Sequence, residues 1–180
     1  RSRAVLTLLR SKRKPALRDV VVVSGGQTGA DQGGLDAAIK LGLPFGGWAP
    51  GGWINERRGI DAKYRWNGTN GLKELKGAGY PERTRMNVVD SDATIIFGLG
   101  SQIDGGSKLT KTICDELNKP SRVINLFNPP HPEDVRVWMD RNLVTVLNVA
   151  GSRESAALGI HDKTVEYLPE VLEGLRDPSK

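Results

Sequence analysis

The fold of this chain is decided by one stretch, Val20-Val21-Val22-Val23-Ser24-Gly25-Gly26-Gln27-Thr28-Gly29-Ala30-Asp31. The valine run predicts a strand buried on both faces, and residues 31–40 have the spacing of an amphipathic helix. A glycine-rich turn from strand to helix directs backbone N–H groups and the positive end of the helix dipole at an anion. We therefore predict a phosphate site in this loop. Its candidate residues are Ser24, Gly25, Gly26, Gln27, Thr28 and Gly29.

The loop matches neither of the two common phosphate-binding motifs. It lacks the lysine that a P-loop requires, and its glycines fit only the second half of a dinucleotide-binding fingerprint. The alternative is a tight turn without a ligand, in which Thr28 or Asp31 caps the helix.

Strand and helix patterns alternate along the rest of the chain. Strands are expected at residues 43–50, 93–97, 123–127 and 144–147. Helices are expected at 82–91, before Pro120, after Pro132 and at 163–175, the last one kinked or restarted at Pro169. Residues 51–81 show no period and are expected to form a long irregular loop. This order predicts a three-layer α/β fold with a mainly parallel, open sheet.

In such a sheet, ligands bind at the carboxyl ends of the strands. The loops at residues 24–29, 98–107 and 148–153 are therefore expected to meet at one crevice. The second of these loops repeats the pattern of the first, because Gly105, Gly106 and Ser107 open a helix there. An ordinary strand-to-helix loop explains these three residues equally well.

Arg83 and Asn87 share one face of the helix predicted at 82–91. The planar guanidinium of Arg83 is suited to clamp an anion, which lysine cannot imitate. The alternative is that Arg83 pairs with Asp90 or Asp92 and only holds the helix in place.

Charge is unevenly distributed over the 180 residues. Residues 1–18 form a basic N-terminal arm with seven Lys and Arg and no acid, whereas residues 19–180, expected to be a single domain, carry a net charge of −2. This argues against a nucleic-acid partner, and no apolar run is long enough to span a membrane. The arm is expected to pack on a neighbouring subunit or to be the end of a processed targeting segment. We expect a cytoplasmic location, with an organellar one as the alternative if the arm is such a targeting segment.

Evidence for catalysis and for a metal site is weak in the sequence. It contains no Gly-x-Ser-x-Gly motif, and neither His nor Cys114 has a partner at ligand spacing. Surface pairing or capping explains the carboxylates of Asp31, Asp36, Asp90 and Asp92. We therefore expect no catalytic residue and no metal. The four tryptophans, the apolar residues of the arm and the long loop predict a homo-oligomer, either a dimer or a tetramer.

An ordered series of motifs between residues 20 and 160 resembles the family named putative molybdenum carrier proteins. The motifs are Ser24-Gly25-Gly26-Gln27-Thr28-Gly29-Ala30-Asp31, Gly46-Gly47-Trp48-Ala49-Pro50, Glu82-Arg83-Thr84 with Asn87, Asp90-Ser91-Asp92, Gly105-Gly106-Ser107 and Leu147-Asn148-Val149-Ala150-Gly151. The resemblance implies a Rossmann-like fold and, from the family's name, the molybdenum cofactor as the ligand.

The same superfamily contains nucleotide phosphoribohydrolases, the lysine decarboxylase-like type, with the motif Pro-Gly-Gly-x-Gly-Thr-x-x-Glu. When Gly105 and Gly106 are aligned with it, Lys108 and Leu109 replace Gly-Thr, and Thr112 replaces the catalytic Glu. We therefore favour a non-catalytic protein that binds or carries a phosphate-bearing small molecule, with the molybdenum cofactor or a nucleotide as the candidate ligand. The alternatives are a nucleotide-processing enzyme and a nucleotide-sensing protein.

Overall fold

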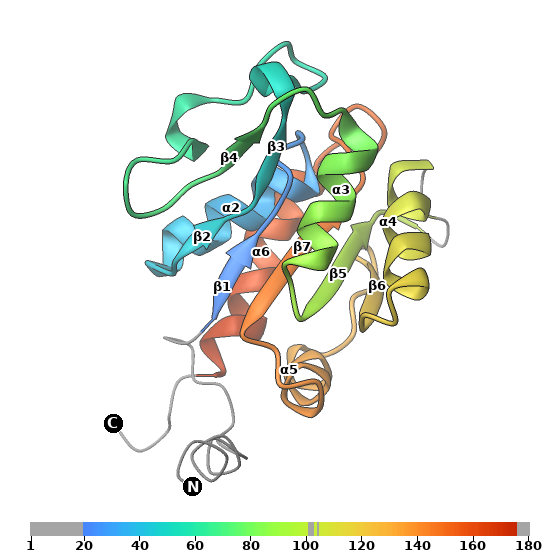
Figure 1. Ribbon diagram of the computed structural model, residues 1–180. Coiled ribbons are helices and arrows are strands. Elements are labelled where there is room, and N and C mark those ends of the chain that lie inside the picture. Colours follow the sequence, from blue (N-terminus) through green and yellow to red (C-terminus); the bar gives the residue numbers. More distant parts are fainter. Residues whose placement is uncertain (1–19, 101–102, 104, 176–180) are drawn as a thin grey trace, which may run out of the picture.

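The structure is a computed structural model that describes residues 20–100, 103 and 105–175. Within these residues, a five-stranded sheet has the order β2-β1-β7-β5-β6, and each strand pairing in it is parallel (Figure 1). Its strands are β1 (Val21–Val23), β2 (Phe45–Gly46), β5 (Ala93–Gly98), β6 (Ser121–Asn125) and β7 (Val146–Gly151).

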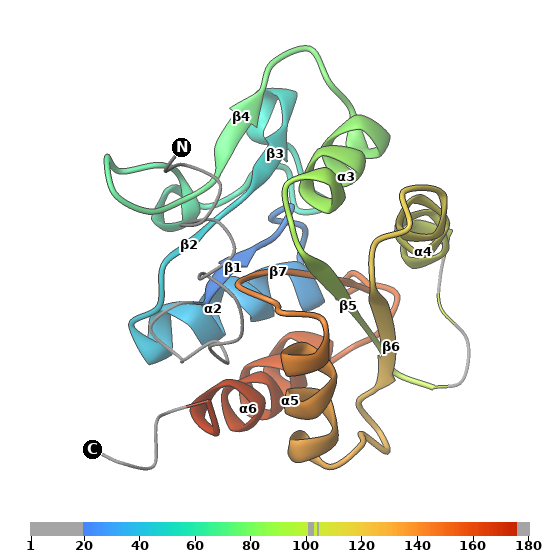
Figure 2. The ribbon, with the colours of Figure 1, turned by 60° about the horizontal axis from the view of Figure 1, so that its bottom comes forward.

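Helices cover both faces of the sheet (Figure 2). One layer contains α2 (Ala30–Leu41), α5 (Pro132–Arg141) and α6 (Ile160–Glu173), and the other contains α3 (Tyr80–Val89) and α4 (Gly105–Glu116). The prediction of a Rossmann-like three-layer fold with a parallel sheet is therefore confirmed. The basic arm at residues 1–18 lies outside the described residues, and none of the described helices is long and apolar enough to cross a membrane.

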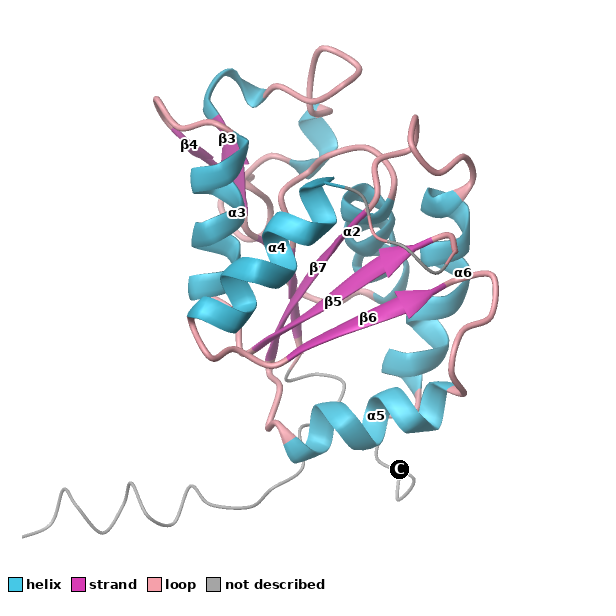
Figure 3. Cartoon of the chain, turned by 90° about the vertical axis from the view of Figure 1, so that its right-hand side faces the viewer, coloured by secondary structure: helices cyan, strands magenta, loops and turns pink. Residues whose placement is uncertain are grey.

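The main core lies between the sheet and the layer of α2 and α6. Every residue of β5 is buried, as expected for a parallel strand covered on both faces. Phe97 of β5 meets Tyr167 of α6 edge to face, with the ring centroids 6.1 Å apart. The central strands are thus packed on the helical layer, and loops follow directly from their carboxyl ends (Figure 3).

The strand predicted at residues 43–50 is wrong in one respect, because the chain turns at Gly47. This glycine has φ +115°, and a Cβ atom on it would lie 2.2 Å from the Ser24 carbonyl oxygen. Beyond Gly47 the chain enters β3 (Trp48–Pro50), which pairs in parallel with β4 (Lys73–Leu75) in a second, two-stranded sheet.

The segment at residues 51–81 is largely irregular, as expected, but it is more ordered than a single loop. This segment contains β4 and the short helices η2 (Gly51–Trp53) and η3 (Ala62–Tyr64). It buries a second apolar cluster against α2, and the members of this cluster are Leu35, Ala49, Ile60, Tyr64 and Leu72. The segment has no detectable period because its structure depends on these long-range contacts rather than on a repeating pattern.

Two other boundaries differ from the prediction. β7 begins at Val146 and ends at Gly151, so Asn148 is inside the strand rather than in the loop after it. α6 continues through Pro169 without a restart. The buried residues Leu168 and Leu172 on either side of the proline belong to the main core, and their packing holds the two parts of the helix together.

Candidate functional site

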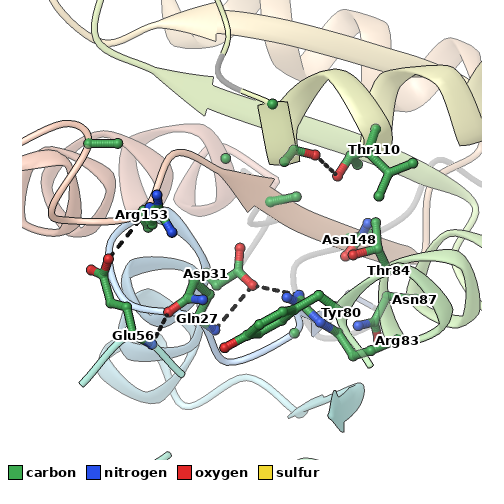
Figure 4. Close-up of a pocket in the computed structure, with 17 residues that line it drawn as sticks. Gln27, Asp31, Glu56, Tyr80, Arg83, Thr84, Asn87, Thr110, Asn148 and Arg153 are labelled. Carbon is green, nitrogen blue, oxygen red and sulfur yellow. Dashed lines mark hydrogen bonds and ion pairs between the residues drawn. The ribbon is translucent and has the colours of Figure 1, made fainter. Parts of the chain in front are cut away.

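A cavity of about 370 Å³ opens at the carboxyl ends of the strands, between α3 and α4 (Figure 4). All three loops that the sequence placed at this edge contribute to it, together with α3 and the long segment after β3. Its lining residues are Gly25, Gln27, Asp31, Glu56, Tyr80, Arg83, Thr84, Asn87, Gly105, Gly106, Leu109, Thr110, Asn148, Ala150, Gly151, Arg153 and Ala156.

The central feature of the pocket is an ion pair between Arg83 of α3 and Asp31 of α2. Arg83 Nη1 donates to Asp31 Oδ2 at 3.0 Å, and the two residues are only 9% and 4% exposed. The backbone N–H of Gln27 donates to the same carboxylate oxygen at 3.2 Å. Burial raises the pKa of Asp31, and the opposing effects of Arg83 and the Gln27 N–H are smaller, so that this pKa lies above its ordinary value.

Gly25 makes room for the guanidinium of Arg83. A Cβ atom on Gly25 would lie 1.5 Å from Arg83 Nη1 and 2.3 Å from its Cζ. On the other side, the Arg83 Cζ lies 5.6 Å from the centre of the Tyr80 ring, within the range of a cation–π contact. The side chain of Arg83 is therefore held in one place, and the absence of a side chain at Gly25 is what permits it.

Arg83 keeps a donor that the protein does not use. Its Nε–H is buried and has no hydrogen-bond partner within the described part of the chain. A buried donor without a partner costs free energy, and a bound water, ion or ligand is one of the ways in which such a group is satisfied. This pattern identifies Arg83 as a candidate anion-binding residue.

The pairing of Arg83 with Asp90 or Asp92 is wrong. Asp90 accepts a hydrogen bond from the Trp48 indole at 2.7 Å, and Asp92 accepts three hydrogen bonds from Thr145 and Val146. The interpretation of Asp31 as a surface or capping carboxylate is wrong as well, since it is buried and α2 has no side-chain cap. Sequence analysis missed the true pair because its members are 52 positions apart.

Several polar groups of the loop at residues 24–29 form hydrogen bonds within the protein. The Thr28 N–H donates to Gln27 Oε1 at 3.0 Å, the Ala30 N–H to the Ser152 carbonyl at 3.1 Å, and the Ser24 hydroxyl to the Val149 carbonyl at 2.8 Å. Of the candidate residues in this loop, only Gly25 and Gln27 line the pocket.

Gly26 and Gly29 are needed by the fold itself. They have φ values of +75° and +79°. A Cβ atom on Gly26 would lie 2.7 Å from a methyl carbon of Leu72, and one on Gly29 would lie 2.5 Å from the Ser152 carbonyl oxygen. The close approach that requires these glycines is therefore made by the protein's own chain, as the tight-turn alternative proposed.

The second loop is more open. α4 begins at Gly105, and a Cβ atom there would have no atom within 4 Å. Gly105 and Gly106 both line the pocket, whereas Ser107 is buried and does not. The N-terminus of α4 therefore faces the cavity with its backbone exposed, which is the arrangement that favours an anion.

Asn87 serves the fold more than the pocket. Its Oδ1 accepts from the Trp48 N–H at 2.8 Å, and its Nδ2 donates to the Trp48 carbonyl at 3.0 Å. Both ends of the amide are thus used to fasten α3 to β3. The side-chain amide of Asn148 is also engaged within the protein, because its Nδ2 donates to Thr94 Oγ1 at 3.2 Å.

Glu56 closes one end of the pocket, and nothing in its sequence context identified it. Its backbone N–H donates to Gln27 Oε1 at 3.0 Å, and its carboxylate accepts from the Thr28 hydroxyl and from Ser155. Arg153 Nε lies 3.6 Å from the same carboxylate. Burial raises the pKa of Glu56, but these hydrogen bonds outweigh it and place the pKa below its ordinary value. Glu56 therefore joins three loops around the cavity.

Comparison with known proteins agrees with the family resemblance of the sequence motifs. The profile of the circularly permutated YpsA SLOG family matches residues 22–172. The chain belongs to this family. Among solved structures, it is similar to a putative molybdenum carrier protein from Syntrophus aciditrophicus, with 35% identity, a TM-score of 0.76, and coverage of 89% of this chain and 98% of the other. A search of curated proteins found no match. The resemblance inferred from the motifs is therefore confirmed.

This member of the circularly permutated YpsA SLOG family also has a polar cluster outside the pocket, in a second cavity of about 410 Å³. Asp36 of α2 accepts from Lys63 Nζ at 3.0 Å and from the Tyr64 hydroxyl at 2.9 Å, and it contacts His161 Nε2 at 2.9 Å. His161 Nδ1 lies 2.8 Å from Asp162. Burial lowers the pKa of His161, but the two carboxylates raise it by more. The cluster ties α2 and α6 to η3.

In the part of this chain that the structure describes, no group of three or more His, Cys, Asp or Glu side chains is arranged to hold a metal ion. Cys114 is buried in a small apolar cluster with Val88 and Ile113, which includes no pocket residue. The chemistry available in the pocket is that of hydrogen bonds, a buried ion pair and a helix N-terminus.

Proposed function

We propose that this protein binds a phosphate-bearing small molecule in the pocket between α3 and α4 and holds it without reaction. The observation that carries the proposal is the buried guanidinium of Arg83, whose Nε–H has no partner among the described residues. A phosphate oxygen satisfies such a donor with a charge-assisted hydrogen bond, which is stronger than a neutral one. The ligand thereby removes an unfavourable feature of the free protein.

A second source of positive potential supports the same ligand. The N-terminus of α4, at Gly105 and Gly106, opens onto the cavity. An anion between this helix start and Arg83 interacts with both the guanidinium and the helix dipole. Arg153 Nε lies 3.6 Å from the Glu56 carboxylate, and the Arg153 side chain is 59% exposed. Arg153 therefore provides a further cation at the rim of the pocket.

The size and remaining lining of the pocket fit a small organic molecule. A cavity of about 370 Å³ is within the range of ligand pockets. Leu109, Ala150, Ala156 and the ring of Tyr80 offer apolar surface to the body of the ligand, and Asn148 and Thr110 offer polar groups. The solved relative bears the name of a molybdenum carrier. The molybdenum cofactor, a phosphate-bearing pterin, would be a cargo of this class, and nucleotides form the second group of candidates.

The proposal is tested by comparing matched ligands that differ only in the phosphate. The melting temperature of the purified protein is measured with nucleoside monophosphates, the corresponding nucleosides and inorganic phosphate. Mass spectrometry of small molecules released from the freshly purified protein identifies any ligand that it retains. Stabilisation by the phosphate-bearing compounds and not by the nucleosides supports the proposal. Equal responses to both sets contradict it.

One observation favours an enzyme as a second candidate. Asp31 is a buried pocket carboxylate with a raised pKa, and such groups are common among general acids and bases. Incubation with nucleoside monophosphates, followed by chromatography for released base, distinguishes the two functions. Release of base by the wild-type protein that is lost in a folded Asp31→Asn variant, with folding checked by circular dichroism, establishes the enzyme. A bound and unchanged nucleotide supports the carrier.

A further inference from the structure

Asp31 and the anion proposed above compete for the same cation. The carboxylate of Asp31 already receives one N–H of Arg83 at 3.0 Å. Arg83 Nε–H, which has no partner among the described residues, belongs to the same guanidinium. An anion bound there lies close to a carboxylate that is only 5% exposed, so little water separates the two negative groups. Figure 4 shows Asp31 extending into the cavity beside Arg83.

We propose that anion binding at Arg83 draws a proton onto Asp31, so that the pocket takes up its ligand together with one proton. This inference rests on the proposed function, because it requires the anion to bind at Arg83. It adds a property of the site: the ligand is bound in its fully ionised form, and its affinity depends on pH through a protein group.

The other charged groups around the pocket do not replace Asp31 in this role. Glu56 also lines the cavity, but its hydrogen bonds with Thr28 and Ser155 favour its ionised form and lower its pKa. Arg153 is close to Glu56, on the opposite side of the pocket from Arg83 in Figure 4. Tyr80 contributes its ring to Arg83. Asp31 is thus the carboxyl group in direct contact with the anion-binding cation.

The environment of Asp31 makes protonation accessible. Burial is the largest influence on this carboxyl and raises its pKa, and Arg83 together with the Gln27 N–H offsets only part of the effect. An anion bound to Arg83 repels the ionised carboxylate of Asp31 and partly neutralises the positive charge that stabilises it. The pKa of Asp31 therefore rises further when the ligand binds. Proton uptake follows at any pH between the values for the free and the occupied pocket.

Sulfate is the appropriate probe, because it remains a dianion throughout the working pH range and any proton taken up must therefore bind to the protein. Its affinity is obtained at each pH from the rise in melting temperature, against sodium chloride at equal ionic strength. For the wild-type protein the dissociation constant is expected to increase by about tenfold per pH unit between the two pKa values of Asp31.

Two carboxylate variants locate the proton. Asp31→Asn should bind sulfate with an affinity that does not change with pH. Glu56→Gln alters the other pocket carboxylate and can change the absolute affinity, but the change of affinity per pH unit should stay that of the wild type. Because Asp31→Asn removes half of a buried pair and could fail to fold, a second measurement uses the wild-type protein alone. A pH indicator in weakly buffered solution should report about one proton taken up per bound sulfate.

The outcomes separate this inference from the proposed function. A pH-independent affinity without proton uptake overturns the inference and leaves the anion site in place. A pH dependence that persists in Asp31→Asn, or disappears in Glu56→Gln, also overturns it. If the wild-type protein binds neither sulfate nor a nucleoside monophosphate, the proposed function fails and this inference fails with it.

Discussion

Replacing Arg83 with lysine tests whether this residue serves the ligand, the fold or both. Lysine keeps the charge but loses the fork that spans Asp31 and the pocket, so Nε–H is lost as a donor. A hydrogen bond to a charged group contributes about 1.5–3 kcal/mol. Loss of the proposed phosphate contact should therefore weaken ligand affinity by about tenfold to about 150-fold.

The same substitution weakens the pair between Arg83 and Asp31, which is nine-tenths buried. Loss of a comparable charge-assisted bond lowers the free energy of unfolding by about 1.5–3 kcal/mol. For a domain of this size the melting temperature should fall by about 3–12 °C. Both effects are expected in one variant, since the structure gives Arg83 both a partner and an unused donor.

The assay measures ligand affinity and melting temperature on the same protein samples. Arg85→Lys is the matched control, because Arg85 lies on the same helix and pairs with Glu116, with side chains that are 50% and 55% exposed. That pair contributes little, and its variant should match the wild type in both measurements. If Arg83→Lys loses stability but keeps full affinity, Arg83 is only structural and the reasoning is refuted.

Three further predictions concern the rest of the molecule. Gly29→Ala should lower the free energy of unfolding in urea by at least about 1–3 kcal/mol, because of its φ of +79°, and unchanged stability would contradict the contact with Ser152. The raised pKa of His161 means that its stabilising contribution is lost as pH rises above about 6.5. The melting temperatures of His161→Gln and the wild type should therefore become more similar at alkaline pH. A difference that does not change with pH would argue against an ion pair of His161 with Asp36 and Asp162. Light scattering should show a dimer or tetramer, and a monomer mass would refute the proposed oligomer.

Local patterns in the sequence were sufficient for the layers of the fold. The four valines that precede Ser24 and the apolar run of β5 are continuous because both faces of these strands are covered, and such runs are visible without a structure. Because loops that follow parallel strands lie at the same edge of the sheet, the loops at residues 24–29, 98–107 and 148–153 could be placed together. This reasoning led to the pocket, and six of the eleven candidate residues line it: Gly25, Gln27, Arg83, Asn87, Gly105 and Gly106.

Other features depend on contacts between distant residues and could not be read from local patterns. A positive φ at Gly26 and Gly29 suits both a ligand cradle and a tight turn, and only the positions of Leu72 and Ser152 decide between them. Asn87 carries a side chain suited to a ligand, yet both ends of its amide bind the backbone of Trp48, 39 positions away. The parallel pairing of β3 with β4 likewise joins segments that are far apart in the sequence, so local patterns do not reveal it.

The most direct measurement of the central claim follows the Arg83 Nε–H itself. In ¹⁵N-labelled protein, its resonance is identified as the arginine Nε–H signal that is missing in Arg83→Lys. We predict that inorganic phosphate shifts this signal in a saturable manner, and that chloride at equal ionic strength leaves it in place. A signal that stays unchanged at saturating phosphate, while resonances elsewhere in the protein move, would contradict the claim that Arg83 binds the anion.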